Sequence, residues 1–212
     1  KMKKVIVAIT GASGVCLGFD FLKVAVKFCE IHCVISKNAM RVLNDEMGII
    51  LDTHSMNPAK KGIVLASSAS LNNALNLDAV FRSPNAKFYD DEDIGAALAS
   101  GSFGADAMMI APCSINTLAK ISCGLADTLI TRAAAVMLKE RKRLVLGVRE
   151  TPFSTISLRQ MSELSELGVI IAPPILGYYA HADTLSDMQN FIIGKWLDAL
   201  GIENEIYKRW KI

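Results

Sequence analysis

The chain has 212 residues, 51% of them hydrophobic, and its 23 basic and 21 acidic residues leave a formal net charge of +2. This length accommodates one substantial domain, and the small, well-mixed charge argues against a nucleic-acid partner. No apolar run approaches the roughly 18 residues that a bilayer span needs, and the first residues do not resemble a signal peptide, so we expect a cytoplasmic protein without a membrane span.

Short apolar runs alternate with stretches of helical period along the chain. The runs predict strands at 4–10, 31–36, 107–112, 144–149 and 168–172. The stretches between and after them predict helices at 14–29, 38–46, 92–99, 115–122, 127–141, 155–167 and 184–200. Because nearly continuous apolar strands alternate with helices, we predict an α/β fold with a doubly wound parallel sheet, in a single domain over 1–212.

Residues 51–91 interrupt this alternation. They contain a stretch rich in Ser, Asn and Ala, "ASSASLNNALNL", and then "RSPNAKFYDDED", which we interpret as a loop leading into a helix. We therefore expect an irregular excursion with one short helix over 51–91, and a C-terminal helix and tail over 184–212.

Hydropathy and cysteine usage bear on assembly and on metal binding. The mean hydropathy of +0.33 is high for a monomer of this length, so we expect a homo-oligomer that buries apolar surface between its copies. The five cysteines form no C-x-x-C pair and are odd in number, which predicts reduced, buried thiols. The three histidines are scattered, and we expect no metal site.

A glycine-rich segment, "ITGASGVCLG" at 9–18, directly follows the first predicted strand. Its spacing, Gly11-x-x-Gly14-x-x-x-Gly18, differs from the G-x-G-x-x-G pattern of dinucleotide sites. A sharp turn into a helix presents free N–H groups, and together with the Ser13 hydroxyl these suit a single phosphate. A strand-to-helix turn without any ligand is an equally good interpretation of this segment taken alone.

Ligands of open parallel sheets bind at the carboxyl ends of the strands. In the predicted fold this edge carries the glycine loop, Ser36, residues 113–117 and the pair Arg149 and Glu150. Adjacent opposite charges at the end of an apolar strand rarely serve packing, so Arg149 and Glu150 are candidate functional residues.

These motifs occur together in a known family. The chain resembles the UbiX family of flavin prenyltransferases in "GASG" at 11–14, "SGSF" at 100–103, "PCSINTLAKI" at 112–121, "TRAAAVMLKERKRLVLGVRETPFS" at 131–154 and "PPILGYYAHADTLSDMQNFIIGK" at 173–195. The resemblance implies a flavodoxin-like Rossmann sandwich and a metal-independent transferase that joins a dimethylallyl group from dimethylallyl phosphate to N5 and C6 of reduced FMN. It also implies a homo-oligomer, a dodecamer in such families, with active sites between subunits.

The same resemblance implies a recipient for the product. Prenylated FMN serves a partner decarboxylase of the UbiD type, and both ubiquinone biosynthesis and the breakdown of aromatic acids are compatible with this sequence.

FMN binding is assigned by the resemblance to residues of the carboxyl edge. The phosphate loop is matched by Gly11, Ala12 and Ser13, and the other flavin contacts are matched by Ser36, Ser114, Ile115, Asn116, Thr117 and Arg149. For residues 114–117 an ordinary helix N-cap is the competing interpretation.

Dimethylallyl phosphate has a poor leaving group and no magnesium to assist it, so positive side chains must stabilise the departing charge. The family's cationic and hydroxyl cluster for this phosphate is matched by Arg132, Lys139, Tyr179 and Lys195, together with Arg149. For Lys139 and Lys195 the competing interpretation is solvation at the surface.

Three catalytic roles follow from the resemblance. Glu150 is implied as the acid–base residue, Ser13 as a relay for its proton, and Lys139 as a cation at the substrate phosphate. Trp210 matches a tail tryptophan of the family, and an anchor for the C-terminus is an equally good interpretation of it.

Two other functions share parts of this pattern. A flavin-dependent cysteine decarboxylase has the same fold and glycine loop, but here no histidine lies in the helix after the second predicted strand. An FMN-binding electron carrier would not need the whole charged and hydroxyl set, which is Lys139, Arg149, Glu150, Tyr179 and Lys195.

Overall fold

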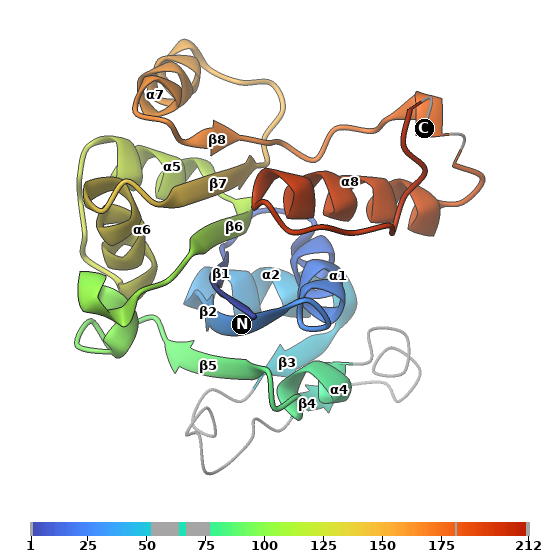
Figure 1. Ribbon diagram of the computed structural model, residues 1–212, viewed down its shortest axis with the longest axis horizontal. Coiled ribbons are helices and arrows are strands. Elements are labelled where there is room, and N and C mark those ends of the chain that lie inside the picture. Colours follow the sequence, from blue (N-terminus) through green and yellow to red (C-terminus); the bar gives the residue numbers. More distant parts are fainter. Residues whose placement is uncertain (1, 52–63, 67–76, 181, 211–212) are drawn as a thin grey trace.

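The computed structural model describes residues 2–51, 64–66, 77–180 and 182–210. Its central sheet has six strands in the order β5-β2-β1-β6-β7-β8, all paired in parallel (Figure 1). These are β1 (Lys3–Ile9), β2 (Cys29–Ile35), β5 (Ala86–Asp90), β6 (Ala107–Cys113), β7 (Arg143–Val148) and β8 (Ile170–Ile171). The prediction of a doubly wound parallel sheet is confirmed, and the strand order is that of Rossmann-type folds, with its switch point between β1 and β6.

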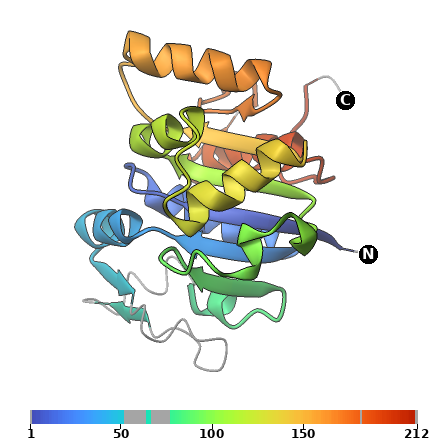
Figure 2. The ribbon, with the colours of Figure 1, turned by 90° about the vertical axis from the view of Figure 1, so that its left-hand side faces the viewer.

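Helices cover both faces of the sheet. One face carries α1 (Val15–Ala25), α2 (Lys37–Met47) and α8 (Leu185–Ala199), and the other carries α5 (Ile115–Ser122), α6 (Leu129–Lys139) and α7 (Thr155–Glu166). Figure 2 shows α5 and α6 in front of the strands, with α7 beside the β8 edge. Side chains of β1 alternate between the two cores, with Val5 and Val7 on the α1 side and Ile6 on the α6 side.

Short elements complete the described chain. An antiparallel pair is formed by β3 (Ile49–Leu51) and β4 (Val64–Ala66), and the remaining short elements are α4 (Leu77–Phe81) and the 3₁₀ turns η2 (Ala97–Ala99), η3 (Gly101–Phe103) and η4 (Tyr178–Ala180). Residues 52–63 and 67–76 of the expected irregular excursion lie outside the described residues.

The structure differs from the predicted elements at the edge next to β2. Residues 86–90, predicted as part of a loop, form the parallel strand β5, and the helix predicted at 92–99 is replaced by turns followed by η2. An edge strand pairs on one side only, and β5 has no continuous apolar run to reveal it. The predicted strand at 168–172 is shortened to β8, because Gly168 turns the chain with φ +88°.

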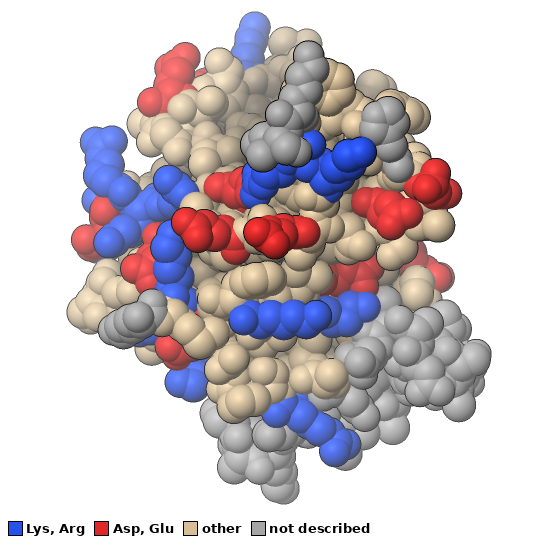
Figure 3. Space-filling model, turned by 45° about the vertical axis from the view of Figure 1, so that its right-hand side comes forward, with Lys and Arg blue, Asp and Glu red and all other residues tan. Residues whose placement is uncertain are grey.

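The described part of the chain holds no helix that is long and apolar enough to cross a membrane. On the face drawn in Figure 3, basic and acidic side chains are interspersed, as expected for a chain with a net charge of +2.

Candidate functional site

The loops that follow β1 and β6 are joined by a buried hydroxyl. Thr10 is 2% exposed; its Oγ1 donates a hydrogen bond to the carbonyl oxygen of Pro112 at 2.8 Å and accepts one from the Ser114 N–H at 2.8 Å. Two further contacts hold the neighbouring strand ends, because Ser36 N–H donates to Ile9 O at 3.0 Å and Arg149 N–H to Cys113 O at 3.0 Å. Four strand ends are therefore in register along one edge.

Four helices begin around a single cavity of about 580 Å³ at this edge. They are α1, α2, α5 and α6, whose N-caps are Gly14, Ser36, Ser114 and Thr128. The cavity is lined by residues 10–13, by the first turns of α2 and α5, by the start of α6, and by Arg149 and Glu150. Positive ends of helix dipoles surround this space, which therefore favours an anion.

Some donors in the cavity wall have no partner. Among the described residues, no acceptor is found for the backbone N–H groups of Gly11, Ser13, Ile115 and Asn116. These groups belong to the glycine loop and to the first turn of α5, which Thr10 holds side by side. Unpaired donors on two adjacent segments form a ready binding site for one phosphate.

The two cap serines both accept a hydrogen bond from the helix that they cap. Ser36 Oγ accepts from Ala39 N–H at 3.1 Å, and Ser114 Oγ accepts from Thr117 N–H at 3.2 Å and also lies 3.0 Å from Thr117 Oγ1, where either hydroxyl can donate. The N-cap interpretation of Ser114 is thus realised in the structure. A hydroxyl that accepts one bond can still donate its proton, so capping a helix and contacting a ligand are compatible.

The glycine loop packs closely on α2. A Cβ atom on Gly11 would lie 2.5 Å from the Cβ of Asn38, so only glycine fits there without moving α2. Gly14 has φ +82°, and its N–H donates to both carboxylate oxygens of Glu46 at 3.1 Å. The sequence analysis did not identify Glu46. This residue lies near the end of α2, and it contacts Gly14 because α2 runs past the glycine loop.

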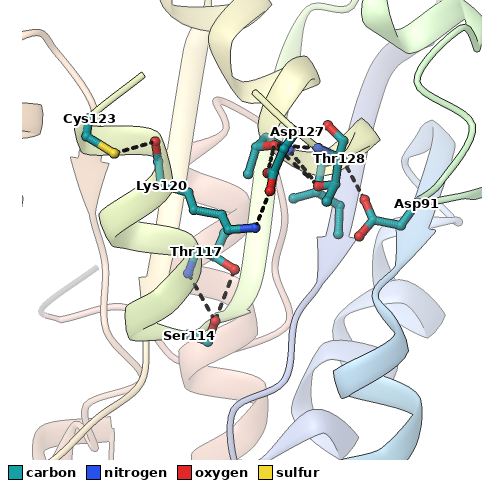
Figure 4. A network of polar contacts seen from close by, with 9 residues as sticks. Asp91, Ser114, Thr117, Lys120, Cys123, Asp127 and Thr128 are labelled. Atoms are coloured by element: carbon teal, nitrogen blue, oxygen red, sulfur yellow. Dashed lines mark hydrogen bonds and ion pairs between the residues drawn. The ribbon is translucent and has the colours of Figure 1, made fainter. Parts of the chain in front are cut away.

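Asp91 is a second residue that the sequence analysis missed. Its Oδ1 accepts from Ile130 N–H at 2.9 Å and its carbonyl oxygen accepts from Leu129 N–H at 2.8 Å, so it holds the first turn of α6 against the cavity (Figure 4). Burial raises the pKa of the Asp91 carboxyl, against the hydrogen bonds that lower it. Asp91 follows β5, and no signal for that strand was recognised in the sequence.

A lysine at the cavity wall is already paired. Lys120 Nζ lies 2.7 Å from Oδ2 of Asp127, and Thr131 Oγ1 donates to Oδ1 of the same carboxylate at 3.4 Å (Figure 4). Lys120 and Thr131 both line the cavity. The positive charge of Lys120, a residue of α5, is therefore balanced by Asp127 just before α6.

The structure brings together one part of the predicted site. Lining the cavity are all the residues predicted to bind the cofactor and two predicted to be catalytic, namely Gly11, Ala12, Ser13, Ser36, Ser114, Ile115, Asn116, Thr117, Arg149 and Glu150. Glu150 Oε1 accepts from Thr151 N–H at 2.9 Å, and no ion pair with Arg149 is found among the described residues.

The predicted substrate-phosphate residues Arg132, Lys139, Tyr179 and Lys195 do not line this cavity. Lys139 ends α6, about 15 Å along the helix axis from the turn that does, and its Nζ pairs with Glu140 at 2.5 Å. Tyr179 and Lys195 lie on η4 and α8, with exposed side chains.

Thiolate and metal chemistry have no support at this cavity. Burial raises the pKa of Cys113, next to the lining residue Ser114, to about 12, so its thiol stays protonated. All five cysteines are free; Cys29, Cys33 and Cys113 are buried.

His32 is 2% exposed, and its ring nitrogens form hydrogen bonds with Glu30 and Tyr89 within the sheet. Within the described ranges, no group of three His, Cys, Asp or Glu side chains could hold a metal ion.

Comparison with known sequences identifies close relatives. The chain matches the Flavoprotein family over residues 1–197. It is 44% identical to the flavin prenyltransferase UbiX of Campylobacter jejuni, with 98% of both chains covered. It is 40% identical to the flavin prenyltransferase UbiX of Helicobacter pylori strain J99, again with 98% of both chains covered.

Solved structures agree with this relationship. A crystal structure of AnUbiX in complex with FMN and dimethylallyl pyrophosphate has a TM-score of 0.80 at 34% identity, covering 100% of this chain and 98% of that chain. A dodecameric FMN-dependent UbiX-like decarboxylase from Escherichia coli O157:H7 has a TM-score of 0.78 at 34% identity, with 98% of both chains covered. The FMN-binding protein AtHal3, at 20% identity and a TM-score of 0.62 over 92% of this chain and 95% of that chain, shares the fold alone.

Replacing Thr10 with valine tests the junction between β1 and β6. Valine has the shape of threonine but leaves the Ser114 N–H without its acceptor, which costs about 1–3 kcal/mol. We expect Thr10→Val to lower the thermal unfolding midpoint at a fixed protein concentration and Thr10→Ser to lower it less. Thr155→Val, at an exposed position with no recorded side-chain bond, is the control. Equal midpoints for the two valine variants would contradict the assignment.

Proposed function

Because this chain belongs to the UbiX family of flavin prenyltransferases, we propose that it joins a dimethylallyl group from dimethylallyl phosphate to N5 and C6 of reduced FMN. The observation that carries the proposal is the pair of adjacent segments with unpaired backbone N–H groups, which open into the same cavity as Arg149 and Glu150. The product, prenylated FMN, would be delivered to a decarboxylase of the UbiD type.

The residues of the cavity fit FMN. Its single phosphate would be held by the N–H groups of Gly11 and Ser13 and by the start of α5, and a volume of about 580 Å³ is in the range of small-molecule sites. The reduced flavin ring would supply the nucleophilic atoms of the reaction. Ser36, Ser114 and Arg149 stand where they could donate hydrogen bonds to its polar atoms.

Glu150 is proposed as the group that moves the proton. It lines the cavity, and its carboxylate is bonded only to the N–H of the next residue among the contacts recorded in the described chain. A carboxylate without a cationic partner is available to exchange protons. Ser13 lies on the same cavity wall with an exposed side chain, and it would relay that proton.

Of the cluster predicted to bind the phosphate of the second substrate, only Arg149 lines the cavity of the single chain. Lys139 lies at the opposite end of α6, next to Gly101 of the "SGSF" segment: a Cβ on Gly101 would lie 3.1 Å from Lys139 Nζ. We therefore propose that Lys139 of one subunit serves the cavity of a neighbouring subunit in a homo-oligomer. Positive charge there would stabilise the departing phosphate in place of a metal ion.

A carboxylate introduced at Ser13 tests the FMN phosphate site. In Ser13→Asp the new charge would face the phosphate in a partly dry cavity, so we expect FMN affinity to fall about tenfold or more, or roughly 1.4 kcal/mol. Isothermal titration with FMN measures it. Ser162→Asp adds the same charge on the exposed face of α7 and serves as the control. Parental affinity in Ser13→Asp would remove residues 11–14 from the site.

The isosteric change Glu150→Gln tests the acid–base role. Glutamine keeps an oxygen for the Thr151 N–H but cannot exchange the proton, so we expect single-turnover prenylation to slow by roughly 10²–10⁴-fold. FMN binding is expected to be unchanged, and Glu166→Gln on exposed α7 is the control. The assay is mass spectrometry of the flavin after anaerobic incubation with dimethylallyl phosphate, or in parallel with the diphosphate. Turnover at the parental rate would exclude Glu150 as the acid–base residue.

Mixed oligomers test whether sites are shared. Lys139→Ala and Glu150→Gln subunits are expected to be inactive when each is assembled alone. If Lys139 serves a neighbouring cavity, oligomers assembled from an equal mixture combine an intact Lys139 with an intact Glu150 in about a quarter of their sites. We expect that share of the parental activity to return. Mixed oligomers without activity would show that Lys139 acts within its own subunit, and activity of the Lys139→Ala protein alone would exclude a role for Lys139.

A further inference from the structure

One carboxylate at the end of α8 receives hydrogen bonds from three residues of the tail beyond that helix. Arg209 spans both oxygens of Asp198, with Nη1 to Oδ2 at 3.0 Å and Nη2 to Oδ1 at 2.8 Å. Tyr207 Oη donates to Oδ2 at 2.5 Å, and Asn204 Nδ2 donates to Oδ1 at 2.9 Å. The bidentate geometry defines the position of Arg209 more closely than a single contact would. Asp198 thus joins the tail to α8 at three points.

The charge states of these groups preserve the hydrogen bonds between Asp198 and the tail at neutral pH. Burial opposes ionisation of Asp198, but hydrogen bonds from Arg209 and Tyr207 outweigh it and hold the pKa of this carboxyl below its usual range. Burial and the neighbouring carboxylate raise the pKa of Tyr207 to about 12. At neutral pH Asp198 is therefore an acceptor and Tyr207 a donor, and their bond does not depend on small changes in pH.

Two glycines allow aromatic rings to pack closely against the backbone. A Cβ on Gly194 would lie 2.1 Å from the ring of Tyr207, and one on Gly177 would lie 2.3 Å from the ring of Phe191. The rings of Tyr207 and Phe191 then meet edge to face at 5.3 Å. These fits place the tail against one face of α8 with little freedom to slide.

The row of rings continues to a residue of the proposed site. Phe191 contacts Tyr179 at 5.3 Å between ring centroids, and Tyr179 contacts Trp210 at 5.6 Å, both edge to face. The tail runs back along α8 and ends beside η4, which follows β8 (Figure 1). Trp210 therefore lies beside η4, although its place in the sequence follows α8.

Trp210 cannot hold this position by its own burial. Its side chain is 60% exposed and Tyr179 is 44% exposed, so the contact between them removes little apolar surface from water. The tail also packs Ile202 and Tyr207 against the core. Its charged contact, and the one made by the residue next to Trp210, is the bidentate pair of Arg209 with Asp198.

We infer that Asp198 is a positioning residue: it anchors the tail, the anchored tail holds Trp210 against Tyr179, and Trp210 fixes the Tyr179 hydroxyl for the phosphate of the prenyl substrate. This inference rests on the proposed function and on the role that the family resemblance implies for Tyr179, which is to bind that phosphate. Asp198 acts through the tail and does not touch the substrate itself.

The test is the substitution Asp198→Asn in the full chain, with Glu203→Gln in the exposed tail as its control. Asparagine keeps the size of the side chain but turns an amide group toward Arg209. We expect KM for dimethylallyl phosphate to rise at least fivefold with FMN affinity unchanged, while the weakened hydrogen bonds lower the thermal midpoint. We also expect limited trypsin cleavage after Lys208 or Arg209, followed by mass spectrometry, to become at least tenfold faster. Arg209→Lys, which cannot bridge both oxygens, is expected to change both quantities in the same direction.

A double-mutant cycle with Tyr179→Phe separates positioning from general loosening. If Asp198 acts through the Tyr179 hydroxyl, Asp198→Asn raises KM in the parental protein but adds nothing in the Tyr179→Phe background. Additive effects, unchanged KM in a variant with a freed tail, or parental resistance to trypsin would each overturn the inference. If the parental protein forms no prenylated flavin, the proposed function fails, whereas the trypsin comparison still reports whether Asp198 anchors the tail.

Discussion

The buried hydroxyl of Thr10 is the contact on which the geometry of the site depends. It lies at the switch point of the sheet, where the connections from β1 and β6 leave in opposite directions and a crevice opens between them. By donating to Pro112 O and accepting from Ser114 N–H, it stops the two loops from separating beyond the last ladder bond. The glycine loop and the start of α5 therefore face the same space, and their unpaired N–H groups converge.

The electrostatics of the cavity explain why one phosphate, and not two, is the fitting ligand of this part of the site. Four helices begin around the cavity, but the start of α6 is already satisfied by Asp91 and by the capping box of Thr128 and Thr131. Asp127, just before α6, is paired with Lys120 of α5. Free donors are left on the glycine loop and on α5, so an anion is favoured where these two segments meet.

The lengths of α6 and α8 determine where the predicted site residues outside the cavity lie. The first turn of α6 lines the cavity, whereas Lys139 at its last turn lies beside η3, and one helix cannot bring both ends to one ligand. On α8 the tail beyond the helix is bonded to Asp198, and Trp210 at its end contacts Tyr179. Under the proposed function, Lys139 would act on the cavity of a second subunit, whereas Tyr179 is contacted by the C-terminal tail of its own chain.

Local pattern in the sequence determined the parallel sheet, most of its helices and the loops that gather at the carboxyl edge, because strand and helix periods are properties of neighbouring residues. The edge that carries the cavity could be predicted for the same reason, since parallel strands end at the same edge, whereas the individual cofactor-binding residues were assigned from the family resemblance. Only the tertiary structure revealed β5 and with it Asp91, because an edge strand paired on one side needs no apolar run. Likewise, no spacing rule places Glu46 beside Gly14, Lys139 far from Glu150, or Trp210 beside Tyr179. These distances depend on the directions in which packed helices run, which a linear pattern does not contain.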